Sequence, residues 1–187
     1  MQFDAVVIGG GLAGLSCAIR LAEHGKRCAV VSSGQSALYF SSGSLDLLAH
    51  LPDGSPVASP LSALSELAQQ APQHPYSLMG AAQVAALATQ AEQLLQRCGW
   101  QMQGDSSQNH LRVTPLGTRR ATWLSPQAIP VSPLDGKLPW QNIAVLGIEG
   151  FLDFQPQMAA SSLMQEQGLK AEVAFLHLPV LDRLRNN

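Results

Sequence analysis

Three glycines, Gly9, Gly11 and Gly14, have the spacing with which many proteins hold the phosphate of a nucleotide. They follow an apolar run of strand length, residues 3–8, and they open a segment in which apolar residues recur at helical spacing. A second apolar run, residues 28–31, comes next. This order of strand, turn, helix and strand predicts a phosphate site at the helix N-terminus. The alternative is an ordinary tight turn of a parallel sheet, and the surrounding pattern favours the nucleotide site.

Each of these glycines has a separate expected role. Gly9 lets the chain turn sharply out of the strand. Gly11 has no Cβ, so a phosphate can approach the free N–H groups and the positive end of the helix dipole. Gly14 lets the helix pack closely against the strand.

Ser32 stands at the end of the second strand, where NAD- and FAD-binding folds usually have an acid that binds the adenosine ribose. A serine offers a single, weaker contact. NADP needs a nearby Arg or Lys for its 2′-phosphate, and residues 33–36 contain neither. The nicotinamide dinucleotides are therefore disfavoured.

Two further groups of residues are candidates for ligand contacts. Ser41, Ser42 and Gly43 form a small polar cluster that can approach the edge of a flat ligand, although composition alone favours a solvated loop. Arg119 and Arg120 stand out in a chain with few charges and can bind a phosphate of the substrate or cofactor. A solvated or ion-paired strand surface is an equally weighted alternative for the two arginines.

The remaining sequence predicts the elements that position these groups. Ser59-Pro60 predicts the start of a helix that ends near residue 71, and residues 73–76 should break it. An apolar stripe predicts a packing helix over residues 81–98. Short strands are expected at 100–103, 110–113 and 118–124, a second strand-helix-strand unit at 142–178, and the start of a helix at 181–187. The isolated His50, His74 and His110 are expected to be structural or surface residues.

These patterns divide the chain into three expected parts. Residues 1–100 form the nucleotide-binding unit with its helices, residues 101–140 a β-rich insertion, and residues 141–187 the start of a second strand-helix-strand unit.

Composition excludes several classes of protein. The chain has 187 residues, of which 46% are hydrophobic and 13% charged, and its net charge of −2 provides no basic field for nucleic acid. It has no apolar run of membrane-spanning length, and its start leads straight into a strand, which leaves no room for a signal peptide. Cys17, Cys28 and Cys98 are expected to be buried, reduced thiols of a cytoplasmic protein. There is no Cys-x-x-Cys, so neither zinc nor an iron–sulfur cluster is expected.

Several stretches together carry a family resemblance. The most specific is Phe-Ser-Ser-Gly-Ser-Leu-Asp at residues 40–46. Others are residues 3–15, 34–38, 50–54, 74–76, 114–118, 122–124, 153–154 and 184–187. With these motifs the whole chain resembles the B subunit, a flavoprotein, of the bacterial anaerobic glycerol-3-phosphate dehydrogenases.

This resemblance implies an α/β fold of the FAD/NAD(P)-binding, glutathione-reductase-like Rossmann type, with a β-rich insertion and incomplete at the C-terminus. It implies a flavoprotein subunit of an enzyme that oxidises sn-glycerol 3-phosphate to dihydroxyacetone phosphate in anaerobic respiration, with electrons passed to the quinone pool. The implied partners are a larger, catalytic subunit that bears FAD, and an iron–sulfur subunit that docks at the membrane. The B subunit itself would be cytoplasmic, peripheral to the inner membrane through its partner, with no direct membrane insertion.

The resemblance assigns FMN to the B subunit, with FAD as the alternative. Ser32 in place of an acid agrees with FMN, which has no adenosine ribose, whereas the glycine motif normally holds a pyrophosphate. Family members are roughly twice this length, because the flavin fold needs a later segment to close over the ring, so the fragment alone is expected to be inactive.

Two other functions remain open. One is a non-catalytic assembly protein that bridges the FAD-bearing and iron–sulfur partners and has a vestigial nucleotide-binding fold. The other is a flavin-dependent oxidase that acts alone. No catalytic acid or base is assigned from the sequence.

Overall fold

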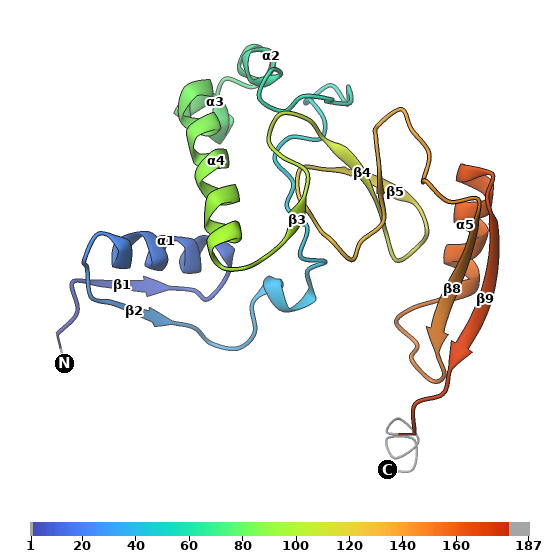
Figure 1. The fold of residues 1–187 in the computed structure, drawn as a ribbon. Coiled ribbons are helices and arrows are strands. Elements are labelled where there is room, and N and C mark those ends of the chain that lie inside the picture. Colours follow the sequence, from blue (N-terminus) through green and yellow to red (C-terminus); the bar gives the residue numbers. More distant parts are fainter. Residues whose placement is uncertain (1, 180–187) are drawn as a thin grey trace. The chain divides into compact units, whose positions relative to one another are not determined.

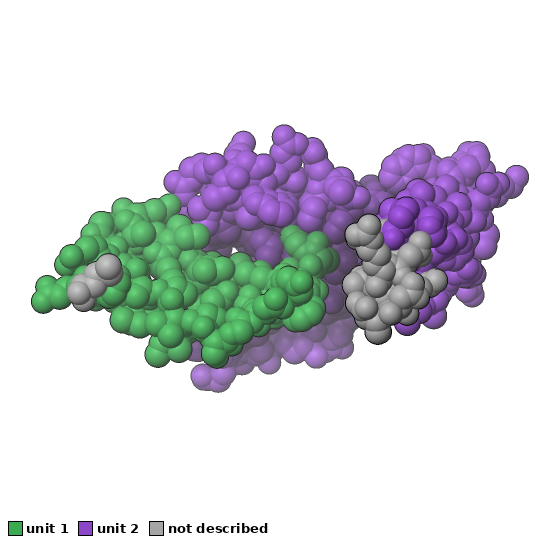
Figure 2. Space-filling view, turned by 90° about the horizontal axis from the view of Figure 1, so that it is seen from below, with its two compact units in different colours: residues 1–43 green, residues 44–187 purple. Residues whose placement is uncertain are grey.

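A computed structural model describes residues 2–179 of the chain, and its elements fall into two units, residues 1–43 and 44–187 (Figures 1 and 2). This division differs from the expected boundaries at residues 100 and 140. Contacts cross both expected boundaries. Ala88 of α4 (Ala81–Arg97) packs with Trp123 and Leu124 of the β-rich segment in one apolar cluster. Val113 of the same segment packs against a second cluster, which contains Leu163 and Leu169.

The first unit has the predicted order of strand, turn, helix and strand. The strands β1 (Ala5–Ile8) and β2 (Cys28–Val31) pair in parallel, in a register that runs from Ala5↔Cys28 to Ile8↔Val31. The helix α1 (Leu12–Glu23) connects them (Figure 1). Its C-cap is His24, and a short 3₁₀ helix, η1 (Ala37–Phe40), follows β2.

One face of the β1–β2 sheet is apolar and exposed. Side chains alternate along β1, where Ala5 and Val7 are half-buried and Val6 and Ile8 are exposed. Val31, the register partner of Ile8, is also exposed. Parallel sheets in proteins are usually covered on both faces, so this face lacks its usual covering layer in the described residues.

The second unit begins with two short helices before α4, and both differ from the expectation. The helix α2 (Leu64–Gln70) begins after Ser59, because the Ser59 hydroxyl donates a 2.7 Å hydrogen bond to the carbonyl of Ser107 and caps no helix. The expected break at residues 73–76 holds a short helix, α3 (Pro75–Met79). His74 caps it by accepting the backbone N–H of Tyr76 at 3.1 Å.

The helices α2 and α4 pack against apolar side chains of the loop that precedes them. Leu48, Leu51 and Val57 pack with Leu67 of α2 and Val84 of α4 in one buried cluster. The apolar stripe of α4 therefore packs against other elements, as its sequence predicts.

The β-rich segment contains a three-stranded antiparallel sheet in the order β5-β4-β7 and a separate β3–β6 pair. Its strands are β3 (Met102–Gln103), β4 (His110–Val113), β5 (Arg119–Thr122), β6 (Ser125–Pro126) and β7 (Val131–Ser132). The expected strand at 118–124 ends earlier, at Thr122, because Leu124 forms an isolated bridge with Leu45.

The predicted second strand-helix-strand unit is confirmed. The strands β8 (Asn142–Ile148) and β9 (Lys170–Leu176) pair in parallel, and α5 (Pro156–Gln167) lies along one face of the pair (Figure 1). Gly168, with a positive φ of 66°, ends α5, as expected of a glycine at this position. The helix start expected at 181–187 lies outside the described residues.

The cysteine expectation is wrong in one respect. All three cysteines are free thiols, but Cys17 and Cys98 are exposed and Cys28 is half-buried. Cys17 lies within α1, which has no buried residue, and Cys98 is the C-cap of α4, whose buried residues, Val84 and Ala88, lie nearer its start.

Candidate functional site

The glycine turn of the first unit presents an open helix N-terminus. Gly9 follows β1 with a φ of +111°, which side chains rarely adopt, and its N–H donates to the carbonyl of Val31 at 2.8 Å. Gly11 is the N-cap of α1 in an extended conformation, and no side chain caps the helix. The first N–H groups of α1 are therefore available to an anion.

The space around the glycines separates their roles. A Cβ on Gly11 would have no heavy atom within 4 Å, so this side of the turn is open. A Cβ on Gly14 would overlap the carbonyl oxygen of Gly9 and lie 3.4 Å from Cγ1 of Val7. Gly14 thus permits close packing of helix and strand, as expected, whereas Gly11 leaves room for a ligand.

Ser32 lies next to this turn. Its Oγ would be 3.0 Å from a Cβ on Gly10, and it donates a 3.4 Å hydrogen bond to the carbonyl of Gly34. The structure therefore brings Ser32 and the glycine turn together at the carboxyl edge of the β1–β2 sheet, where α/β folds bind ligands.

Ser41 has local partners. It is the C-cap of η1, its hydroxyl donates to the carbonyl of Leu38 at 3.0 Å, and it accepts the N–H of Gly43 at 3.3 Å. These bonds hold the turn that contains Ser42 and Gly43. The expected contacts of Ser41, Ser42 and Gly43 with the edge of a flat ligand stay a prediction.

The residues present in the first unit fit a nucleotide phosphate. The open side of Gly11, the uncapped N–H groups of α1 and the lack of an acid in its first turn all favour an anion at this position.

Arg119 is part of the second unit's internal structure. Its Nη1 donates to the Ser132 hydroxyl at 2.9 Å and to the Gly136 carbonyl at 2.8 Å. Its Nε lies 3.6 Å from a carboxylate oxygen of Glu166 on α5. The side chain is only 19% exposed, so it ties β5 to β7 and to α5.

Arg120 pairs with a different residue. Its Nη2 lies 2.6 Å from Oδ2 of Asp46, and its side chain is 60% exposed. Asp46 belongs to the run of residues 40–46 that is most specific in the sequence. Both arginines are thus ion-paired, as in the alternative weighed for them, and their role in binding phosphate stays a prediction.

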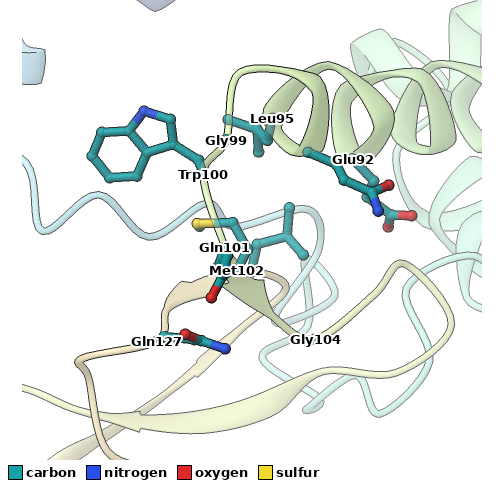
Figure 3. A pocket seen from close by; sticks show the side chains of 10 residues that line it. Glu92, Leu95, Gly99, Trp100, Gln101, Met102, Gly104 and Gln127 are labelled. Carbon is teal, nitrogen blue, oxygen red and sulfur yellow. The ribbon is translucent and has the colours of Figure 1, made fainter.

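A cavity of about 470 Å³ lies at the C-terminal end of α4 (Figure 3). Glu92, Trp100, Met102 and Gln127 are among its lining residues. One oxygen of Glu92, Oε1, accepts the indole N–H of Trp123 at 2.9 Å and the backbone N–H of Ser106 at 2.7 Å. Glu92 therefore joins α4 to the β-rich segment. Sequence reasoning missed it, although it is the one acid within α4.

His110 pairs with Ser125 inside the β-rich segment. Its Nε2 lies 2.8 Å from the Ser125 hydroxyl. Burial, and then the positive charge of Arg112, lower the pKa of His110 below its usual value of 6.5. Because Ser125 is fully buried, this pair is structural, in agreement with the expectation for the isolated histidines.

Two other kinds of site are absent from residues 2–179. No cluster of three or more His, Cys, Asp or Glu side chains there could hold a metal ion. No helix in the same range is long and apolar enough to cross a membrane.

Comparison with known proteins decides the family. Residues 4–185 match the FAD binding domain family, which covers nearly the whole chain. The chain belongs to this family. The FAD binding domain match confirms the Rossmann-type fold expected from the glycine turn, and it indicates a flavin as the cofactor.

Curated relatives of this FAD-binding chain carry one name. The chain is 65% identical to the B subunit of anaerobic glycerol-3-phosphate dehydrogenase of Yersinia pestis bv. Antiqua (strain Antiqua). Identity is 60% to the B subunit of Pectobacterium atrosepticum and 50% to that of Haemophilus ducreyi. Each match covers 100% of this chain and 44% of the relative, so the chain spans less than half the length of these relatives. No solved structure matches the chain.

Proposed function

We propose that this chain provides the flavin site of an anaerobic glycerol-3-phosphate dehydrogenase. The enzyme would oxidise sn-glycerol 3-phosphate to dihydroxyacetone phosphate and pass the electrons to the quinone pool. The observation that carries the proposal is 65% identity over the whole chain to a relative named as the B subunit of this enzyme. The open glycine turn beside Ser32 supports it.

In this proposal the chain's residues bind and orient the flavin, which supplies the redox chemistry when bound. The N–H groups at the start of α1 would hold the phosphate next to Gly11, with Gly9 and Gly14 shaping the turn. Ser32 would lie on the nucleotide side, and Ser41, Ser42 and Gly43 near the ring.

We propose FMN as the flavin, with FAD as the alternative. The position where FAD-binding folds usually place a ribose-binding acid holds Ser32, whose hydroxyl already donates to Gly34. FMN has no adenosine ribose and needs no acid there. The family name, FAD binding domain, supports the alternative.

The proposed partners are a catalytic, FAD-bearing subunit together with an iron–sulfur subunit, which would hold the complex at the cytoplasmic face of the inner membrane. The support is the relatives' name, which makes them one lettered subunit of the dehydrogenase and so implies others.

A second candidate is an assembly protein with a vestigial nucleotide site that bridges the two partners. The observation that favours it is the same Ser32, because loss of the ribose-binding acid also fits a site that has lost its ligand.

The visible spectrum separates the two candidates. The protein to purify is a chimera in which residues 1–187 of this chain replace the matching N-terminal part of the Yersinia pestis relative. A flavin absorption band, with the released flavin identified by chromatography, supports the first function. A well-folded, colourless chimera supports the assembly function and contradicts the first.

A further inference from the structure

A cavity of about 580 Å³ lies at the amino-terminal edge of the β8–β9 pair, within the second unit. Its walls are the segment that leads into β8 and the turn between α5 and β9. Two hydrogen bonds tie these walls together, from the N–H of Leu138 to Oε1 of Gln167 at 3.1 Å and from the N–H of Lys170 to the carbonyl of Gln141 at 2.8 Å. One backbone–backbone bond and one bond to a side chain therefore hold the two walls of the cavity together.

Positive charge is concentrated at this cavity. The chain has three lysines, and two of them, Lys137 and Lys170, line it. Within the described residues neither ammonium group has a hydrogen bond or an ion pair, whereas Arg119 and Arg120 are both paired with carboxylates. Two uncompensated charges next to one cavity favour an anion.

The helix α5 ends at this cavity, but its C-terminus is not capped by the ammonium groups of Lys137 and Lys170. The C-terminus of α5 attracts cations through its dipole, and the ammonium of Lys137 lies 3.7 Å from where a Cβ on Gly168 would be. However, the N–H of Gly168 already bonds the carbonyl of Met164 at 3.0 Å, which closes the helix end. The dipole helps to place the lysines and leaves their N–H groups available to a ligand.

Neutral groups complete the lining. Trp140 is 48% exposed beside the cavity, and Asn142, the register partner of Lys170, lines it too. Gln167 is only 4% exposed, and its Nε2 has no hydrogen-bond partner in the described residues. The wall thus combines an aromatic surface with the polar side chains of Asn142 and Gln167.

We propose that this cavity binds a phosphate monoester, with the phosphate held by Lys137 and Lys170 and the organic part beside Trp140. Lysine binds phosphate as a point charge, so binding should weaken as salt screens it. The phosphate can belong to a soluble small molecule or to a lipid headgroup. The cavity lies wholly in the second unit, so the proposal does not depend on flavin binding.

Nuclear magnetic resonance of methylated lysines tests the proposal. Reductive methylation with ¹³C-formaldehyde keeps the charge and labels the three lysines, which the variants Lys26→Gln, Lys137→Gln and Lys170→Gln assign. Inorganic phosphate, added at constant ionic strength, should shift the Lys137 and Lys170 signals along one saturation curve. Lys26 lies in the first unit and should not follow this curve. Equal shifts of all three signals would overturn the proposal.

The same variants measure affinity and identify the source of the phosphate. Lys137→Gln and Lys170→Gln should each weaken phosphate binding roughly fivefold, as expected for one charge about 4 Å away in water, whereas Lys26→Gln should not. Saturation by sn-glycerol 3-phosphate indicates a soluble ligand. Co-sedimentation with vesicles that contain phosphatidic acid, whose headgroup is a phosphate monoester, but not with phosphatidylcholine vesicles, indicates a lipid headgroup if both cavity variants lose it. Unchanged phosphate affinity in both cavity variants would contradict the proposed site. The Gly11→Val variant should keep the phosphate affinity of the cavity, even if it no longer binds flavin.

Discussion

At the scale of single residues, Gly11 allows a clean test of the phosphate site. Its φ of −82° and ψ of −178° suit valine, and a Cβ there has no neighbour within 4 Å. Gly11→Val in the chimera should therefore fold normally, yet its methyl groups should occupy the space that the phosphate needs. We expect flavin content to fall below about a tenth of the parent value, measured from absorbance after denaturation, with an unchanged circular dichroism spectrum.

Gly14→Ala is the matched control for this variant. Its new Cβ would overlap the Gly9 carbonyl, so it should destabilise the first unit by about 1–3 kcal/mol. Stoichiometric flavin in a folded Gly11→Val chimera would show that the phosphate does not lie at this turn.

Ser32 tests the choice of flavin. Because its Oγ lies beside Gly10, a longer acid at this position should reach the ribose of an adenine dinucleotide. Ser32→Glu should raise the ratio of FAD to FMN bound after the chimera is exposed to an equal mixture, and Ser32→Gln, which has the same length without the charge, is the control. If the ratio stays the same, Ser32 does not face the ligand.

His110 predicts how the stability of the second unit depends on pH. Its pKa is lowered in the folded state, so between that pKa and 6.5 the unfolded chain binds more protons. The contribution of His110 to the stability of the folded state is complete above pH 6.5 and is lost as the pH falls toward the lowered pKa. The urea concentration at the unfolding midpoint should therefore decrease when the pH is lowered from about 7.5 to about 5.5. Fluorescence of the tryptophans, which all lie in the second unit, follows this unfolding.

The decrease of the urea midpoint at low pH should be smaller in His110→Gln, because glutamine does not titrate. His24→Gln, at the exposed end of α1, should behave like the parent. An equal fall in the parent and in His110→Gln would mean that another group causes the pH dependence.

At the scale of elements, the two arginines of β5 should differ in their contribution to stability. Arg119→Met removes two hydrogen bonds and an ion pair of a mostly buried side chain, so we expect a loss of about 1–3 kcal/mol. Arg120→Met removes an exposed ion pair with Asp46, and about 0–1 kcal/mol should be lost. Urea unfolding followed by tryptophan fluorescence measures both. An unchanged midpoint for Arg119→Met, together with a raised KM in the complete enzyme, would favour substrate binding.

The elements that the sequence predicts best are those with local signals. The glycine turn, α1, α4 and the β8-α5-β9 unit carry their own periodicity and glycine stops, and all are present. The sequence predictions that are wrong fail because contacts between distant parts of the chain override the local signals. Ser59 bonds to Ser107, 48 residues away, instead of capping a helix. In the candidate site, the glycine turn could be predicted, whereas the pairing of Arg120 with Asp46 could not, because no local pattern joins residues 74 positions apart.

At the scale of the whole molecule, the exposed face of the β1–β2 sheet should make the isolated chain self-associate. Val6, Ile8 and Val31 are 59%, 88% and 55% exposed on this face. Sedimentation velocity should show association that increases with protein concentration. The chain alone, without the rest of its relatives' length, should also bind FMN weakly or not at all.

Polar substitutions identify the surface responsible. Ile8→Thr keeps a β-branched side chain and should reduce association, whereas Leu116→Thr, at a position 56% exposed in the second unit, should not. A monomer with stoichiometric flavin at all concentrations would contradict this prediction.

The exposed thiols make the arrangement of the two units measurable. Cys17 lies on α1 in the first unit and Cys98 ends α4 in the second, and both side chains are accessible. Exposed thiolates react readily with maleimides, so after Cys28→Ser these two positions can carry a donor and an acceptor dye. Energy transfer between the dyes would then act as a molecular ruler across the boundary at Gly43, and the spread of dye separations would show whether adding flavin fixes one unit against the other.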